Sequence, residues 1–156
     1  MMDVHPILKK LQFKDQGQPV LLIQAPASYE QVQKAFQGVV HTEPRLESYD
    51  FIQVFGATNV ALQDAAKGAV KYVAEDGLLW LCYPKKSSKK YKGSDCSRDT
   101  VTGMLREEGY EPVRQVAIDE DWSALRFRKV EQIKKMTRNF AVTDKGIERT
   151  KKNGQA

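Results

Sequence analysis

The 156-residue sequence has few of the residues that most often carry catalysis, with only two cysteines and two histidines. Cys82 and Cys96 share no Cys-x-x-Cys spacing, and with only His5 and His41 beside them the sequence predicts no metal site. No Ser-His-Asp or Cys-His arrangement can be argued from the spacing. We therefore expect no catalytic residue, and the sequence favours a non-catalytic protein while leaving the enzyme question open.

Long hydrophobic runs are also lacking. No stretch approaches the roughly 18 apolar residues that a membrane-spanning helix needs. The start, Met1 to Pro6, has no basic segment followed by an apolar one, so no secretory signal is visible. We expect a cytoplasmic protein with no membrane contact.

Positive charge is present in excess, and it is unevenly distributed. The formal net charge is +5, and the C-terminal part and one loop hold most of the excess. Such patches can meet the phosphates of a nucleic acid, or they can simply form a solubilising surface, and the sequence leaves both open. The loop contributes Lys85, Lys86, Lys89, Lys90, Lys92 and Arg98.

Apolar runs and helical periodicities alternate along the chain. Alternation of this kind predicts an α/β fold, a three-layer Rossmann-like domain with a mostly parallel sheet of about six strands. The last two strands lie too close in sequence for a crossover, so we expect an antiparallel hairpin at or near one edge. We expect one domain over residues 1–138 and a basic, mobile tail over 139–156. Strands are predicted near residues 19–25, 39–42, 50–55, 78–84, 113–118 and 122–130, and helices near 7–11, 28–36, 58–73 and 97–105.

The strand over residues 78–84 is the clearest of these elements. Its uninterrupted apolar sequence, with Asp76-Gly77 as a turn before it, is typical of a strand buried on both faces. It ends at Pro84 and the basic loop. In open α/β sheets ligands bind at the carboxyl ends of the strands, so the end of this strand is a candidate ligand-binding site.

Candidate ligand-binding residues follow two neighbouring strand ends. Lys85 and Lys86 could hold a carboxylate or phosphate, with Ser87 as a hydroxyl donor. Thr58 and Asn59 lie where a helix begins, and a helix N-terminus favours anions. The alternative is a solvated loop whose charges contribute little.

Three further side chains have both a functional and a structural interpretation. Tyr91 could stack on a nucleic-acid base or anchor its loop. Cys96 lies among basic neighbours that would favour the thiolate. Arg126 could bind a ligand, but a structural pair with a carboxylate of residues 119–121 is favoured.

Two stretches, residues 78–88 (LLWLCYPKKSS) and 119–127 (DEDWSALRF), resemble a family of small bacterial proteins classed only as a domain of unknown function. The resemblance covers roughly residues 7–129 and implies a fold without an activity. The order of elements is similar to a shortened fold of the S-adenosylmethionine-dependent methyltransferases, with one strand–helix unit missing between Thr42 and Asp50.

The methyltransferase resemblance implies cofactor contacts near Gln24 and at Glu43, after the first and second strands. Those enzymes have a glycine-rich turn after the first strand, whereas residues 23–29 (IQAPASY) hold no glycine and place Pro26 in the bend. We therefore expect no cofactor, with S-adenosylmethionine as the exception to be tested. Our leading hypothesis is a non-catalytic or small-anion-binding domain. The alternatives are a divergent methyltransferase-like enzyme and a weak nucleic-acid binder that uses the basic loop and tail.

Overall fold

The structure is a computed structural model and describes residues 5–133. Its elements are α1 (Pro6–Lys10), β1 (Val20–Ile23), the 3-10 turn η1 (Ala27–Tyr29), α2 (Glu30–Lys34), β2 (Val40–His41), β3 (Tyr49–Phe55), α3 (Asn59–Ala69), the 3-10 turn η2 (Val70–Tyr72), β4 (Val73–Pro84), α4 (Arg98–Thr102), β5 (Tyr110–Ala117) and β6 (Trp122–Lys129). The expected tail over 139–156 lies outside the described residues.

The six strands form one sheet in the order β2-β1-β3-β4-β6-β5. The pairs β1/β2, β1/β3 and β3/β4 are parallel, and β6 runs antiparallel to both β4 and β5. The prediction of a mostly parallel α/β sheet with a terminal hairpin is confirmed. Between β2 and β3, residues 42–48 form neither helix nor strand, so the strand–helix unit expected to be missing is absent from this connection.

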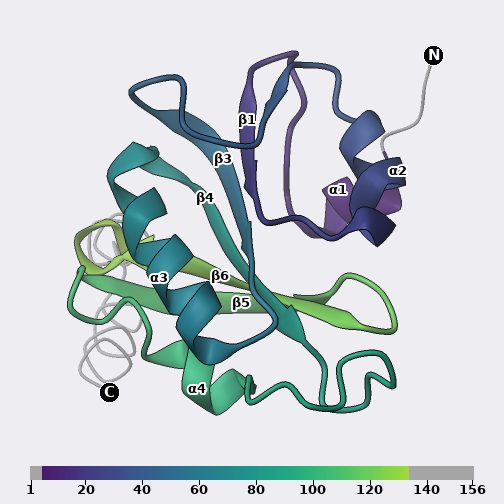
Figure 1. Ribbon diagram of the computed structural model, residues 1–156. Coiled ribbons are helices and arrows are strands. Elements are labelled where there is room, and N and C mark those ends of the chain that lie inside the picture. The colour runs from purple at the N-terminus through teal and green to yellow at the C-terminus, as the bar shows by residue number, and fades with distance from the viewer. Residues whose placement is uncertain (1–4, 134–156) are drawn as a thin grey trace, which may run out of the picture.

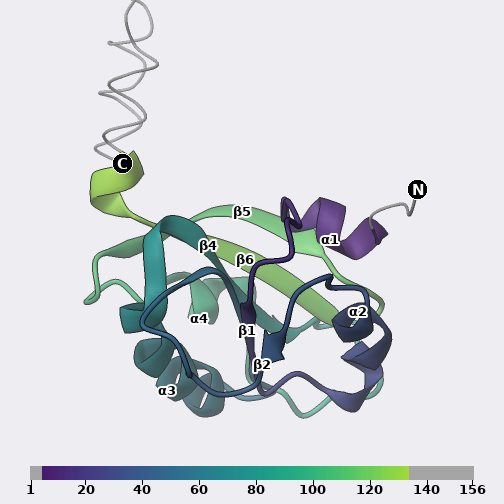
Figure 2. The same ribbon diagram turned by 90° about the horizontal axis from the view of Figure 1, so that it is seen from above.

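Helices cover both faces of the sheet (Figures 1 and 2). On one face, α1 and α2 pack Leu8 and Val32 against the sheet in a core that includes Phe51 and Trp80. On the other, α3 packs Leu62 and Ala66 against Ile52, Leu79 and their neighbours. Successive residues of β3 and β4 enter opposite cores because side chains alternate along a strand.

The apolar run of residues 78–84 is the interior strand that its sequence predicts. Trp80, Leu81 and Cys82 are fully buried, and β4 lies between β3 and β6. The indole Nε1 of Trp80 donates to the carbonyl of Leu11 at 3.1 Å, which ties α1 to the sheet centre. The pattern fits a strand buried on both faces.

Two local predictions are wrong. The helix predicted near residues 28–36 does not begin at Ser28, because residues 27–29 form η1, whose N-cap is Pro26, and α2 starts only at Glu30. The pair Asp76-Gly77 does not end the helix before β4 but lies inside β4, where Asp76 has a φ of 53° and the register to β3 shifts. A single left-handed residue there makes an irregularity within the strand.

No helix within residues 5–133 is long and apolar enough to cross a bilayer.

Candidate ligand-binding edge of the sheet

The carboxyl ends of β1, β3 and β4 lie at one edge of the sheet, which we call the carboxyl edge. It comprises residues 24–29 after β1, residues 56–58 after β3 and the loop 85–97 after β4. The turn between β5 and β6, residues 118–121, lies at the same edge, because the N–H of Lys85 donates to the carbonyl of Asp121 at 2.8 Å. In parallel sheets this is the edge where ligands bind.

The turn after β1 is closed by the protein's own side chains. Gln24 has a φ of 60°, which is unusual without glycine, and its Nε2 donates to the carbonyl of Phe55 at 3.0 Å. Tyr29 follows on η1, buried, with its ring 4.8 Å from that of Phe55. The ends of β1 and β3 are therefore bridged where a glycine-rich turn would leave open backbone.

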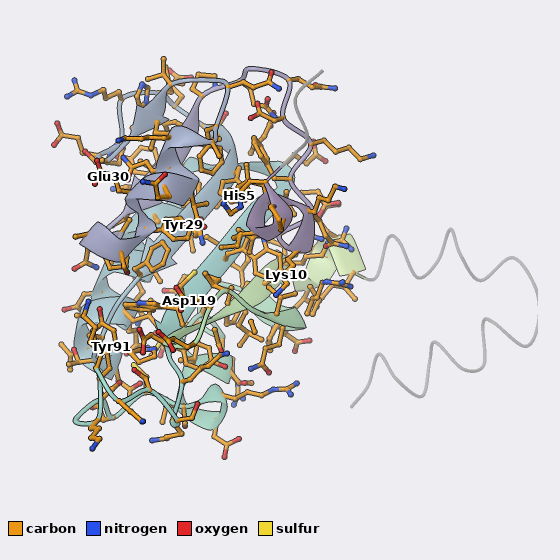
Figure 3. All side chains as sticks on the ribbon, turned by 90° about the vertical axis from the view of Figure 1, so that its right-hand side faces the viewer. His5, Lys10, Tyr29, Glu30, Tyr91 and Asp119 are labelled. Carbon is orange, nitrogen blue, oxygen red and sulfur yellow. The ribbon has the colours of Figure 1, made fainter. Side chains whose placement is uncertain are left out.

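A buried polar chain supports this closure. The hydroxyl of Tyr29 donates to Oε1 of Gln53 at 2.9 Å, and Nε2 of Gln53 lies 3.4 Å from Sγ of Cys82. Burial raises the pKa of both Tyr29 and Cys82, so both groups stay protonated at neutral pH. Figure 3 shows Tyr29, Asp119 and Tyr91 following one another down this side of the molecule.

The N-terminus of α3 carries an internal anion. Thr58 is the N-cap, at the helix start where the sequence placed it, and its Oγ1 accepts from the N–H of Ala61 at 3.2 Å. The N–H of Asn59 donates to Oδ1 of Asp95 at 2.8 Å. The Asn59 side chain donates to the carbonyl of Asp95 at 3.0 Å and accepts from Thr100 at 2.8 Å. A carboxylate of the β4–α4 loop thus takes the place that we expected for a ligand anion.

A second contact holds the same loop at its start. The buried Ser88 donates to Oδ1 of Asp121 at 2.7 Å and accepts from the N–H of Tyr91 at 3.1 Å. The ring of Tyr91 then packs on that of Trp122 with centroids 5.0 Å apart. Tyr91 therefore anchors the loop against the hairpin in this structure.

The remaining predicted ligand residues differ in their surroundings. Lys86 and Ser87 are exposed and Lys85 is half-buried, and within residues 5–133 neither lysine forms an ion pair. Loop 85–97 brings them to the same edge as Asn59. Glu43 instead pairs with Arg45 at 3.1 Å in the exposed segment after β2. Whether any of these residues binds a ligand stays a prediction.

Cys96 and Arg126 have surroundings that the sequence did not predict. Cys96 is fully buried, and burial raises the pKa of its thiol, so the thiol form is favoured over the thiolate that its basic neighbours would promote. Arg126 donates to Oε1 of Gln12 at 3.5 Å, with no carboxylate of the hairpin turn as its partner. On the same strand, β6, Arg128 does pair with a carboxylate, because its Nε donates to Oδ1 of Asp76 at 2.8 Å.

Sequence reasoning missed the roles of Asp95 and Asp121, the two carboxylates that hold the β4–α4 loop at this edge, and considered Asp121 only as a partner of Arg126. No local pattern marks either one, because Asp95 meets a residue 36 positions away and Asp121 one 33 positions away. Within the described part of the chain, no group of three or more potential ligand side chains could hold a metal ion.

Comparison with known proteins identifies the fold of this chain. No protein-family model matches the chain, and no curated protein matches it, so the finer resemblance to a bacterial family of unknown function is unsupported. A S-adenosylmethionine-dependent methyltransferase from Aquifex aeolicus is similar in structure, with a TM-score of 0.57 and 14% identity over 78% of this chain and 86% of that one. A protein of the NADB-Rossmann superfamily from Streptococcus agalactiae has a TM-score of 0.50 and 12% identity over 82% of this chain and 69% of that one. The chain therefore has a Rossmann-like fold of the methyltransferase kind.

Proposed function

We propose that this protein binds a small anionic ligand at the carboxyl edge of its sheet and does not transfer methyl groups. The observation that carries the proposal is the closed turn after β1. Gln24 donates a hydrogen bond to Phe55 and the buried Tyr29 packs on the Phe55 ring, so side chains join the ends of β1 and β3 where a glycine-rich turn would give a ligand access to bare backbone.

The anion preference rests on Lys85 and Lys86. The nearby carboxylates of Asp95 and Asp121 already accept hydrogen bonds from the protein, and neither lysine has an ion-pair partner within residues 5–133. Two uncompensated ammonium groups beside a strand end attract a carboxylate or phosphate. The loop that carries them is held at both ends, by Ser88 and by Asp95, so the charges are presented on an ordered segment.

Calorimetric titration tests the proposal, with pyrophosphate as the probe. We expect saturable binding that the double substitution Lys85→Ala and Lys86→Ala abolishes. The matched control, Lys89→Ala and Lys90→Ala, removes the same charge from the same loop and should bind as the unaltered protein does. An equal loss of pyrophosphate affinity in both double variants would show that binding depends only on net charge, and it would overturn the proposed site at Lys85 and Lys86.

The second candidate is a divergent methyltransferase-like enzyme that binds S-adenosylmethionine near Gln24, Glu43 and Thr58. It is favoured by the fold similarity to the Aquifex aeolicus enzyme. Titration with S-adenosylmethionine and with its demethylated product separates the candidates. Heat of binding that disappears in a Glu43→Ala variant would support the enzyme, and no heat with either compound supports the proposal above.

A further inference from the structure

The connection between β2 and β3, residues 42–48, is held by one side chain, and we call it the β2–β3 segment. It forms neither helix nor strand, and within residues 5–133 it makes no backbone–backbone hydrogen bond. Its hydrogen bonds to the rest of the described chain come from the N–H groups of Arg45 and Leu46, which both donate to the hydroxyl of Tyr49, at 3.0 and 3.2 Å. The segment leads into the start of β3, at the end of the sheet opposite loop 85–97 (Figure 1).

The Tyr49 hydroxyl has a third contact, with the imidazole of His41 on β2. Nδ1 of His41 lies 2.6 Å from the Tyr49 oxygen, and the two rings meet edge to face with centroids 5.6 Å apart. Tyr49 is only 2% exposed, and His41 is half-buried. One buried oxygen atom therefore joins β2, the β2–β3 segment and β3.

The Tyr49 hydroxyl must be the donor in its contact with His41. A phenolic hydroxyl has one hydrogen to donate, and its oxygen has two lone pairs for accepting. The N–H groups of Arg45 and Leu46 use both lone pairs, so the hydrogen is left for Nδ1 of His41. An imidazole nitrogen accepts only when it carries no proton. The arrangement therefore requires a neutral His41 with its proton on Nε2.

Protonation of His41 is incompatible with this arrangement. In the imidazolium both ring nitrogens are donors, so Nδ1–H and the Tyr49 O–H would point at each other across 2.6 Å. If the hydroxyl turned to accept from the imidazolium, three N–H donors would compete for two lone pairs. If the imidazolium swung to solvent, the hydroxyl hydrogen of the buried Tyr49 would lose its acceptor, which is unfavourable in itself. In each case at least one hydrogen bond around Tyr49 is lost.

The surroundings give the imidazolium no compensating anion. No carboxylate within residues 5–133 forms an ion pair with His41. The strand beside β2, β1, has no titratable side chain, and Glu43 bonds Arg45. The charged side chains on the neighbouring segments are Asp15, Glu43, Arg45, Glu47, Asp50 and Lys71. Charging His41 therefore removes a hydrogen bond without adding an ion pair.

We propose that His41 and Tyr49 form a proton-sensitive latch, which holds the β2–β3 segment while His41 is neutral and releases it when His41 is protonated. Histidine is the side chain whose charge ordinarily changes between about pH 5 and 8, so the latch responds to mild acid. The segment that it controls carries Glu43 and Arg45. The latch is independent of the proposed anion site at Lys85 and Lys86, which lies at the opposite end of the sheet.

The tautomer of His41 can be measured directly in the unaltered protein. Nitrogen chemical shifts of the imidazole ring, recorded by NMR at about pH 8, distinguish a proton on Nε2 from a proton on Nδ1. We expect the proton on Nε2 of His41. A proton on Nδ1 would overturn the proposal, because Tyr49 could then no longer be the donor.

Amide hydrogen exchange at Arg45 and Leu46 measures the release of the segment. Between about pH 8 and about pH 5, after correction for the intrinsic exchange rate, protection at these two amides should fall at least about fivefold, as expected for one lost hydrogen bond. The amide of Tyr91, which bonds Ser88 at the other end of the sheet, is the internal reference and should keep its protection.

Two histidine substitutions separate the latch from general effects of acid. His41→Asn keeps a side-chain acceptor near the position of Nδ1 but does not titrate, so protection at Arg45 and Leu46 should become independent of pH. His5→Asn is the matched control, because His5 is the other histidine of the sequence and its Nδ1 accepts from the N–H of Ile7 at 3.1 Å. This control should keep the pH dependence. Equal protection at both pH values in the unaltered protein, or an unchanged pH dependence in His41→Asn, overturns the proposal.

Discussion

Gly56 lies at the turn between β3 and α3, where its N–H donates to the carbonyl of Cys82 at 3.1 Å. A Cβ added there would lie 2.6 Å from Cα of Leu62, inside van der Waals contact with helix backbone. Because α3 is packed on the sheet through Leu62, it has no room to retreat. The absence of a side chain at this residue therefore sets how closely α3 approaches the end of β3.

We expect Gly56→Ala to destabilise the protein by about 1–3 kcal/mol, the usual cost of overpacking. Gly68→Ala is the matched control, since Gly68 lies in α3 with nothing within 4 Å of an added Cβ. Alanine there should stabilise the protein by about 0.5–1 kcal/mol through helix propensity. Urea unfolding measures both changes, and equal effects of the two substitutions would contradict the packing argument.

Loop 85–97 is the element that distinguishes the carboxyl edge. It is long and strongly basic, and contacts with the hairpin turn and with α3 hold it in place. Ser88 makes the side-chain contact that holds the loop closest in sequence to Lys85 and Lys86, because its hydroxyl donates to Oδ1 of Asp121 at 2.7 Å. We therefore expect the conformation of the loop to depend on the Ser88 hydroxyl more than on the lysines around it.

Replacing Ser88 by alanine should free the start of the loop. A lost hydrogen bond of about 1 kcal/mol corresponds to roughly fivefold faster local opening. Amide hydrogen exchange at Tyr91, whose N–H bonds Ser88, measures that opening, and trypsin should cut near Lys89 and Lys90 more readily. Ser87→Ala, at an exposed neighbour, is expected to leave both rates unchanged.

The whole molecule combines a core on each face of one sheet with buried ionisable groups in both. Cys82 and Tyr29 lie in the core under α1 and α2, and Cys96 and Tyr83 in the core under α3 and α4. Burial raises the pKa of each. The free energy of unfolding should consequently depend on pH above neutrality, with contributions from the buried groups of both cores.

The sign of that dependence follows from linkage. In the unfolded chain a cysteine ionises near pH 8.5 and a tyrosine near pH 10, whereas the folded groups stay protonated to higher pH. The free energy of unfolding should thus be level below about pH 8 and fall above it, by up to about 1.4 kcal/mol per pH unit for each cysteine. Urea titrations from pH 7 to 10.5 test this. Cys82→Ala should show a shallower slope, and an equal slope would show that Cys82 does not contribute.

Much of the architecture could be predicted because it depends on local patterns. Two such patterns are the apolar run of residues 78–84 and the helical spacing of alanines in α3. Each indicates the buried side of its element from a short stretch of sequence. The same reasoning placed Thr58 at a helix start, and the short spacing between β5 and β6 required an antiparallel hairpin. It failed at Ser28, where a 3-10 turn stands in place of the predicted helix start, and at Asp76, where a strand irregularity stands in place of the predicted turn.

The sequence by itself determined an α/β chain with a buried central strand, a basic loop after it and no glycine-rich turn, since each depends on residues close together in the chain. Only the tertiary structure decided that Asp95 occupies the N-terminus of α3, that Asp121 holds Ser88, and that Arg128 rather than Arg126 pairs with a carboxylate. Those partners lie 36, 33 and 52 residues apart. Hydrophobic periodicity specifies which face of an element is buried, but not which polar side chains the packed elements bring together.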